Sequence, residues 1–281
     1  MEKLIQGYYE GERALYNSHN LEIHDSTFDN GESPLKESSN LKIYNSIFKW
    51  KYPLWYCKDV LCENVTFLEM ARSGIWYTEN ITIKNSLIDT PKQFRRSKKI
   101  TLENVSIPNA EETMWTCEGI KMINCNTNGN YFGMNSKDIY INGLIHSGNY
   151  AFDGAKNVEI HNAKMASKDS FWNTENVTVY DSTIVGEYLG WNSRNLTFVN
   201  CIIDSLQGMC YIDNIKMINC KLLNTNLAFE RVSNVDADIK SNIDSVKNPY
   251  SGVIKAQKIG EIILDEDIVD KNKTKIIELD R

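Results

Sequence analysis

The stretch that decides the fold is "SFWNTENVTVYDS" (Ser170–Ser182), in which Trp172 stands five residues before an aliphatic side chain. A second stretch, "GIWYTENITIKNS" (Gly74–Ser86), has the same form, with Trp76 at the same distance from its own aliphatic residue. Two such stretches with one spacing indicate an internal repeat, and a repeat has to be identified before any single element is assigned.

The repeat unit has the form N-(V/I/L)-x-(hydrophobic)-x-N, and we use its aliphatic residue as the anchor. Successive anchors are 19 to 21 residues apart. The second residue after every anchor is apolar, and the residue between is polar in ten of the twelve repeats, Leu61 and Tyr140 being the exceptions. This alternation predicts a β-strand with one buried face. The anchors are Leu21, Leu41, Val60, Ile81, Ile100, Ile120, Ile139, Val158, Val177, Leu196, Ile215 and Val235.

Two further positions in the repeat are also apolar. The seventh residue after the anchor is Phe28 or Ile184 in typical repeats, and the sixth residue before it is Leu35 or Phe171. Three short inward-facing segments in each repeat predict a three-sided coil. His146 falls on one of these inward positions, so we expect it to be a core histidine.

The corners of such a coil need residues that turn the chain. The residue before the anchor and the fourth residue after it are each Asn or Asp in ten of the twelve repeats. Asn and Asp tolerate left-handed backbone and bond locally, and stacked amides can form ladders. The sequence therefore predicts an all-β, right-handed parallel β-helix of about twelve coils of 19–21 residues with an irregular C-terminal cap. We expect one domain over residues 1–267, including an N-terminal half-coil, and a cap or tail over 268–281.

The units "NITIKNS", "NVTVYDS" and "NLTFVNC" resemble those of the right-handed parallel β-helix of the pectin-lyase-like superfamily. The whole sequence, from "EGERALY" through "YPLWYC", "YLGW" and "IGEIILDE", resembles a bacterial single-domain β-helix family of unknown function. The resemblance implies the fold and brings no activity. The Asn-Thr-Asp and Asp-Asp motifs of polygalacturonases and the acidic calcium cluster of pectate lyases are absent from the sequence.

The composition of the chain argues against several classes of function. The net charge of −6 and the pI of about 5.4 argue against binding to nucleic acid or anionic lipid. We find no signal-peptide pattern, no membrane-spanning stretch, and an odd number of cysteines without metal-binding spacing. The sequence therefore predicts a cytoplasmic protein without a membrane, nucleic-acid, metal or cofactor partner.

Five of the six tryptophans stand five residues before an anchor, at a position that the alternation predicts to face outward. Neighbouring coils are about 4.8 Å apart, so side chains at this position can stack on one another. We call this position the tryptophan column. Its residues are Tyr16, Lys36, Trp55, Trp76, Arg95, Trp115, Met134, Asp153, Trp172, Trp191, Cys210 and Glu230.

Three hypotheses account for the tryptophan column. The indoles stack only to stiffen the coil, or they bind an oligosaccharide or other elongated polar ligand, or they meet a protein partner or a second copy in a homo-oligomer. Sugar rings suit the second hypothesis because their C–H faces lie on indoles. The predicted ligand-binding residues are Trp55, Trp76, Arg95, Trp115, Trp172, Trp191, Lys36 and Glu230.

Acidic residues beside the column raise the question of catalysis. Asp153, Asp169 and Glu187 belong to three successive repeats next to two of the tryptophans. Glycoside hydrolysis needs one carboxyl group as acid and another as base or nucleophile. These three residues are the candidate catalytic groups for glycan hydrolysis or isomerisation, and solvated surface carboxylates are the alternative.

Overall fold

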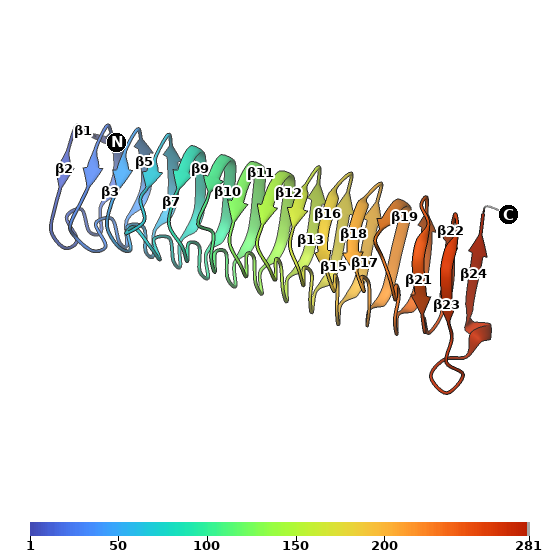
Figure 1. The fold of residues 1–281 in the computed structure, drawn as a ribbon. Helices are drawn as coiled ribbons and strands as arrows, with labels where there is room; N and C mark the ends of the chain where they lie inside the picture. Colours follow the sequence, from blue (N-terminus) through green and yellow to red (C-terminus); the bar gives the residue numbers. More distant parts are fainter. Residues whose placement is uncertain (280–281) are drawn as a thin grey trace. The chain divides into compact units, whose positions relative to one another are not determined.

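The computed structural model describes residues 1–279 as an all-β parallel β-solenoid of about 15 turns. The described residues contain no α-helix and one 3-10 turn, η1 (Lys271–Lys273). The chain divides into two compact units, residues 1–145 and 146–281. In each unit the strands follow one another as successive coils (Figure 1).

Unit 1 consists of parallel strands from consecutive coils. In the second half of the unit each coil contributes one long strand, and in the first half the same path is split into a longer and a shorter strand. The strands are β1 (Glu2–Ile5), β2 (Tyr8–Tyr9), β3 (His19–His24), β4 (Thr27–Phe28), β5 (Ser39–Tyr44), β6 (Ile47–Phe48), β7 (Lys58–Glu63), β8 (Thr66–Phe67), β9 (Glu79–Ile88), β10 (Lys98–Ile107), β11 (Glu118–Asn128) and β12 (Lys137–Ser147), whose last two residues belong to unit 2.

Unit 2 repeats this pattern. Most of its coils carry the split pair of strands, and a separate two-stranded sheet of β21 and β23 forms near the C-terminus. The strands are β13 (Lys156–His161), β14 (Lys164–Ala166), β15 (Glu175–Tyr180), β16 (Thr183–Glu187), β17 (Arg194–Val199), β18 (Ile202–Leu206), β19 (Asp213–Leu223), β20 (Ser233–Ile239), β21 (Ile243–Lys247), β22 (Gly252–Ala256), β23 (Ile259–Ile263) and β24 (Thr274–Glu278).

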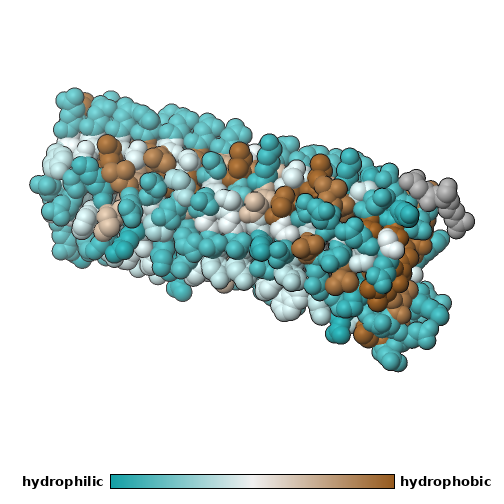
Figure 2. Space-filling model, viewed as in Figure 1, coloured by the Kyte–Doolittle hydropathy of each residue, from teal (hydrophilic) through white to brown (hydrophobic). Residues whose placement is uncertain are grey.

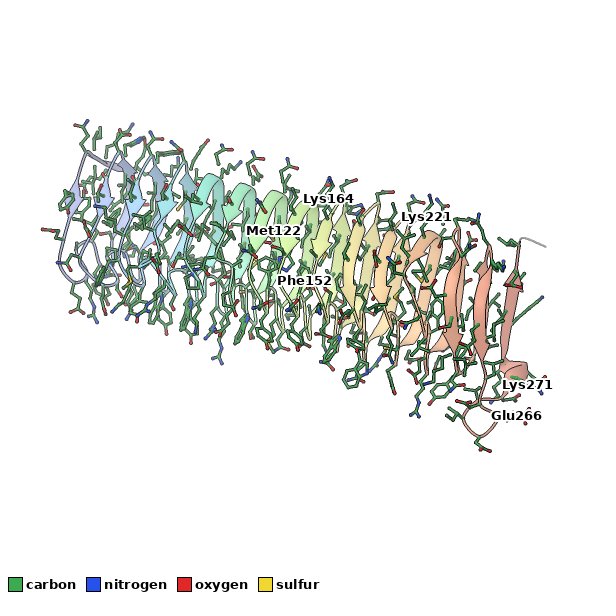
Figure 3. The ribbon with its side chains drawn as sticks, in the orientation of Figure 1. Met122, Phe152, Lys164, Lys221, Glu266 and Lys271 are labelled. Atoms are coloured by element: carbon green, nitrogen blue, oxygen red, sulfur yellow. The ribbon has the colours of Figure 1, made fainter. Side chains whose placement is uncertain are left out.

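The strand register confirms the predicted repeat. In unit 1, Ile81 pairs with Ile100 and Ile100 with Ile120, and in unit 2 Val177 pairs with Leu196. All twelve anchors are buried, with at most 5% of the side chain exposed. Figure 3 shows the result: Met122 and Phe152 are interior side chains, whereas Lys164 and Lys221 are exposed.

The solenoid has more coils than the twelve anchors indicate. Glu2 pairs with Leu21 in unit 1, and Gly252 and then Thr274 continue the row of Val235 in unit 2. These three coils have no aliphatic residue at the anchor position, so the anchor pattern does not count them, and the sequence predicts them only as an N-terminal half-coil and an irregular C-terminal cap. The predicted cap or tail after residue 267 includes β24, which pairs with β22; residues 280–281 lie outside the described part.

The corner asparagines form the predicted ladders. In unit 2 the Asn195 amide donates to Asn176 and the Asn214 amide donates to Asn195, both at 2.9 Å. The second corner is similar, since the Asn219 amide donates to Asn200 at 2.9 Å. These asparagines have φ between +51° and +66°, in the left-handed region. Each amide therefore satisfies its neighbour while its own backbone turns the chain.

His146 gives the interior a pH dependence. Burial lowers the pKa of His146 from 6.5 to about 4, against a smaller opposing effect of a backbone hydrogen bond with Gly148. Between pH 4 and 6.5 the unfolded chain therefore binds more protons than the folded chain. The free energy of unfolding should fall by about 1.4 kcal/mol for each pH unit below 6.5.

We expect the His146→Met variant to lose this contribution, because methionine occupies the equivalent position at Met165 and does not titrate. Urea unfolding of both proteins between pH 7 and pH 4 measures it. Other groups titrate in both proteins, so the quantity compared is the difference between the two slopes. Identical slopes would show that His146 is not buried in its neutral form.

Candidate functional site

The tryptophan column is half-buried rather than fully exposed. Trp55, Trp76 and Trp115 in unit 1 and Trp172 in unit 2 have intermediate exposure, and Trp191 has 37% of its surface exposed. The face of the molecule in Figure 2 is largely hydrophilic, and its apolar residues gather toward the C-terminal end. The column must therefore be judged from its contacts rather than from its apolar area.

Four of the five indoles donate a hydrogen bond to a backbone carbonyl of the next coil, a contact that we call the indole clamp. The N–H of Trp76 donates to the Lys92 carbonyl at 2.7 Å, and that of Trp115 donates to the Tyr131 carbonyl at 2.7 Å. Trp55 and Trp172 donate in the same way to the carbonyls at the equivalent position of the next coil, those of Ser73 and Tyr188. All four acceptors are residues with left-handed backbone, eight residues before an anchor. These indoles therefore serve as contacts between coils.

In unit 1 the side chains of the column also stack on one another. The rings of Trp55 and Trp76 lie 5.3 Å apart and 7° from parallel. The Arg95 guanidinium lies 4.7 Å from the ring centroids of both Trp76 and Trp115, and its Nη2 reaches the Glu112 carboxylate at 3.3 Å. Such cation–π contacts stabilise a partly desolvated guanidinium. In this unit, stacking between coils occupies the side chains predicted to bind a ligand.

Trp191 differs from the other four. No described residue accepts a hydrogen bond from its indole, and it is the most exposed of the five. Its ring lies 5.0 Å from that of Trp172 and 5.9 Å from that of Tyr211. The carbonyl at the position that the other indoles use belongs to Gln207, and the Cys210 thiol donates to it at 3.3 Å. The indole of Trp191 is therefore left open to solvent.

The end of the column corrects the sequence prediction. Cys210 and Glu230 are buried, with 1% and 8% exposure, instead of facing outward. The Glu230 carboxylate pairs with Lys247 at 3.1 Å and accepts a hydrogen bond from the Gln207 amide at 2.9 Å. These contacts offset the free-energy cost of burying its charge. Burial and the nearby negative charge of Glu230 raise the pKa of Cys210 to about 12. Glu230 contacts protein groups where a ligand was expected.

Exposed tyrosines lie beside the tryptophans, at a position that the sequence prediction of the column does not include. Tyr56, Tyr77 and Tyr211 follow the column by one residue, have φ near +57°, and are 36–47% exposed. The rings of Tyr56 and Tyr77 stack at 4.8 Å and 3°. The Lys36 ammonium lies 5.6 Å above the Tyr56 ring. The signal for this second position was the dipeptide Trp-Tyr, which occurs twice at the same distance from an anchor.

A hollow of about 440 Å³ follows this corner in unit 2, and we call it the corner groove. A ladder of amides forms one wall: Asn192 donates to Asn173 at 2.8 Å, and Asn173 donates to Asp153 at 2.8 Å. Tyr211 contributes the aromatic ring next to Trp191. The groove is lined by Lys156, Asn173, Thr174, Glu175, Asn192, Ser193, Arg194, Tyr211 and Asp213.

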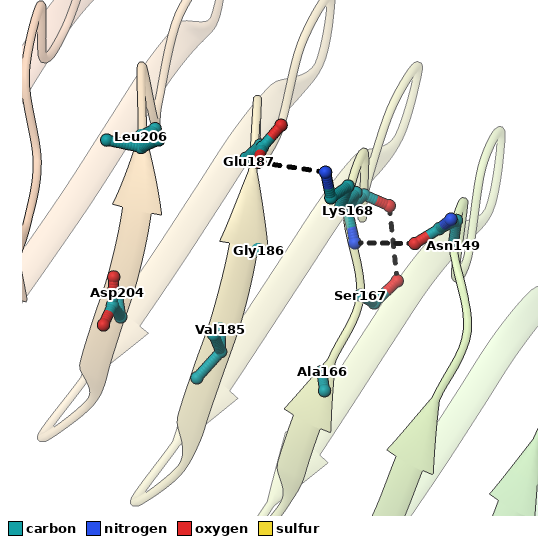
Figure 4. Close-up of a pocket in the computed structure, with 9 residues that line it drawn as sticks. All are labelled: Asn149, Ala166, Ser167, Lys168, Val185, Gly186, Glu187, Asp204 and Leu206. Carbon is teal, nitrogen blue, oxygen red and sulfur yellow. Dashed lines mark hydrogen bonds and ion pairs between the residues drawn. The ribbon is translucent and has the colours of Figure 1, made fainter.

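A second hollow of about 410 Å³ lies over β14, β16 and β18 (Figure 4). Glu187 lines it and pairs with Lys168 at 3.0 Å. The backbone N–H of Asp169 donates to the Glu187 carbonyl at 2.9 Å, which places these two candidates side by side. Burial and the charge of Glu187 raise the pKa of Asp169, opposed by a hydrogen bond from Tyr150. Asp153, the third candidate, instead accepts the Asn173 amide.

The family comparison covers nearly the whole chain. The model of the family "Protein of unknown function (DUF3737)" matches residues 2–277. This chain is a member of the DUF3737 family. No curated protein sequence matches it.

Solved structures similar to this DUF3737 protein are β-helix proteins of low sequence identity. The Streptococcus pneumoniae surface adhesin PfbA has 11% identity and a TM-score of 0.43, covering 94% of this chain and 81% of its own. The A-module of the Azotobacter vinelandii mannuronan C-5 epimerase AlgE4 has 12% identity and a TM-score of 0.33, covering 98% of this chain and 86% of its own. The catalytic domain of a GH87 α-1,3-glucanase has 12% identity and a TM-score of 0.32, covering 99% of this chain and 58% of its own. TM-scores this low carry no argument about function.

Within residues 1–279 of the DUF3737 protein, no helix is long and apolar enough to span a membrane. The same residues contain no group of three or more His, Cys, Asp or Glu side chains placed to hold a metal ion. The corner groove, the hollow over β14, β16 and β18, and the exposed aromatic rings are the features that suggest a function.

We expect Trp115→Phe to lower the free energy of unfolding by about 1–2 kcal/mol, because it removes the indole hydrogen bond and weakens the contact with Arg95. Trp191→Phe is the matched control and should change stability by less than about 0.5 kcal/mol. Urea denaturation of the DUF3737 protein and both variants measures the difference. Equal losses would contradict the distinction between clamped and open indoles.

Proposed function

We propose that the corner groove of unit 2, with Trp191 and Tyr211, binds a carbohydrate-type chain. The observation that carries the proposal is the open indole of Trp191, beside a hollow whose wall is a ladder of amides. The other four column tryptophans are hydrogen-bonded to the next coil, so Trp191 is the one whose N–H has no acceptor among the described residues, and it is also the most exposed of the five.

The chemistry of the groove suits a polyhydroxylated chain. Aromatic faces contact the C–H faces of sugar rings, and Tyr and Trp add a polar group at the edge. Successive coils offer hydrogen-bond donors and acceptors to such a chain. These are the amides of Asn173 and Asn192, the hydroxyls of Thr174 and Ser193, and the charged side chains at the first residues of the strands. Coils are about 4.8 Å apart, close to the length of one sugar unit, so a chain laid across the coils meets the same set of groups repeatedly.

A second candidate function rests on unit 1. Tyr56 and Tyr77 form an exposed stacked pair, and none of the described hollows lies beside it. A flat aromatic pair flanked by Lys36 and Arg96 favours contact with a protein surface, because exposed tyrosines are common anchors of interfaces. Here the partner is another protein or a second copy of the chain.

Titration of intrinsic tryptophan fluorescence with oligosaccharides tests the first candidate. We expect Tyr211→Ala and Trp191→Ala to weaken binding at least about ten-fold, since each removes a stacking surface. Tyr77→Ala is the matched control, because it removes the same side chain at the same position of a coil in unit 1. It should leave sugar binding unchanged.

Size-exclusion chromatography of the same variants tests the second candidate. A shift to a smaller species in Tyr77→Ala, with sugar binding retained, supports an interface on unit 1. An unchanged fluorescence spectrum at every sugar concentration would refute carbohydrate binding.

Glycan hydrolysis by Asp153, Asp169 and Glu187 stays a prediction, and Glu187 lines the second hollow rather than the corner groove. We assign the proton donor to Asp169, whose pKa is raised, and the base to Glu187, which pairs with Lys168. Asp169→Asn and Glu187→Gln should abolish the release of reducing ends and keep the fluorescence response. Asp204→Asn is the control, since it changes another carboxyl group of the same hollow. Release of reducing ends by either active-site variant at the normal rate would exclude this assignment.

A further inference from the structure

The corner groove has a charged rim whose sign alternates from coil to coil. The rim residues start the strands of unit 2, and the register pairs Lys156 with Glu175, Glu175 with Arg194, and Arg194 with Asp213. Two cations and two carboxylates therefore sum to zero. The Lys156 ammonium already lies 3.3 Å from the Glu175 carboxylate.

Stacking between coils explains this alternation. Residues at the same position of adjacent coils are neighbours in a parallel sheet, and like charges placed opposite one another destabilise it. The same position in unit 1 alternates as well: Lys98 and Lys137 flank Glu118, at 3.8 and 3.3 Å. In these stretches the opposite charges on neighbouring coils avoid the repulsion that like charges would cause.

The amide wall does not change this balance. It begins at Asp153, which holds the Asn173 amide, and it ends at Arg231, whose guanidinium lies 5.6 Å above the Tyr211 ring. One negative and one positive group again cancel. The chain as a whole carries a net charge of −6, which does not attract anions.

We infer that the ligand of the corner groove is an uncharged glycan laid across the coils, an inference that rests on the proposed function. A carboxylate on the ligand that approached Arg194 to about 4 Å would also lie about 6 Å from each of Glu175 and Asp213. Coulomb energy falls as the inverse of distance, so the two repulsions offset most of the attraction of Arg194 and of the more distant Lys156, and a ligand carboxylate gains almost nothing to replace its hydration. The rim disfavours a uronate chain.

Neutral hydroxyl groups meet no such conflict. A hydroxyl group both donates and accepts. Along the rim it can accept from Lys156 or Arg194 and donate to Glu175 or Asp213, and on the other wall it can meet both ends of an asparagine amide. Donors and acceptors that alternate with the coils thus suit vicinal hydroxyl groups on successive sugar units.

The test compares two probes of equal length on the intact chain, the neutral glucose hexamer cellohexaose and a hexamer of galacturonate, by tryptophan fluorescence at low and high salt. We expect the neutral hexamer to bind with a Kd that salt does not change, and the uronate hexamer to bind at least about ten-fold more weakly. Tighter, salt-sensitive binding of the uronate hexamer would overturn the inference and leave the proposed function standing. Binding of neither hexamer would overturn both.

A double variant, Glu175→Gln with Asp213→Asn, isolates the effect of the rim. It leaves the aromatic rings and the amide wall intact and gives the rim two uncompensated cations. We expect it to bind the uronate hexamer about ten-fold more tightly than the unmodified chain at low salt, and to bind the neutral hexamer with a similar Kd. An unchanged uronate affinity would show that the rim does not select the ligand, and would contradict the inference.

Discussion

The constraint on which the structure depends is that every position of the repeat lies against its own equivalent in the next coil. Parallel strands in register place such residues about 4.8 Å apart. A position can therefore hold only side chains that tolerate a copy of themselves as neighbour. Aliphatic groups, Asn amides and aromatic rings meet this condition directly, and charges meet it by alternating in sign. The interior, the corners, the tryptophan column and the groove rim are four answers to one requirement.

The corners show how that requirement compensates for a backbone cost. Left-handed backbone is unfavourable for most L-residues, yet every coil uses it, as at Asn176, Asn195 and Asn214. An asparagine there donates to the previous coil and accepts from the next, so the side chain that relieves the turn also ties the coils together. The same arrangement recurs at Asn173 and Asn192, where the ladder forms one wall of a groove. A structural device thus becomes a row of polar groups facing solvent.

The sequence predicts the features that depend on a residue's own repeat position. The burial of Val177 and the ladder at Asn195 follow from period and residue type alone. The indole clamps do not, because the acceptor of Trp115 is a backbone carbonyl of Tyr131, and no side-chain pattern marks a carbonyl. The coils at Glu2, Gly252 and Thr274 escape detection because the register of their neighbours, and not an anchor of their own, holds them in place. Glu230 is buried because Lys247, outside the recognisable repeats, neutralises it.

A regular solenoid satisfies its own side chains, so its functional groups should appear where the regularity stops. Trp115 is engaged by both neighbouring coils, because Arg95 stacks on its ring and the Tyr131 carbonyl accepts its N–H. At Trp191 the column ends, since the next coil offers Cys210, a smaller side chain whose thiol takes the carbonyl that an indole would have used. The break leaves one indole more exposed than the other four and without an acceptor for its N–H among the described residues. The groove beside it is built from the same repeat as the rest of unit 2, and the break is what leaves an indole of the column available to a ligand.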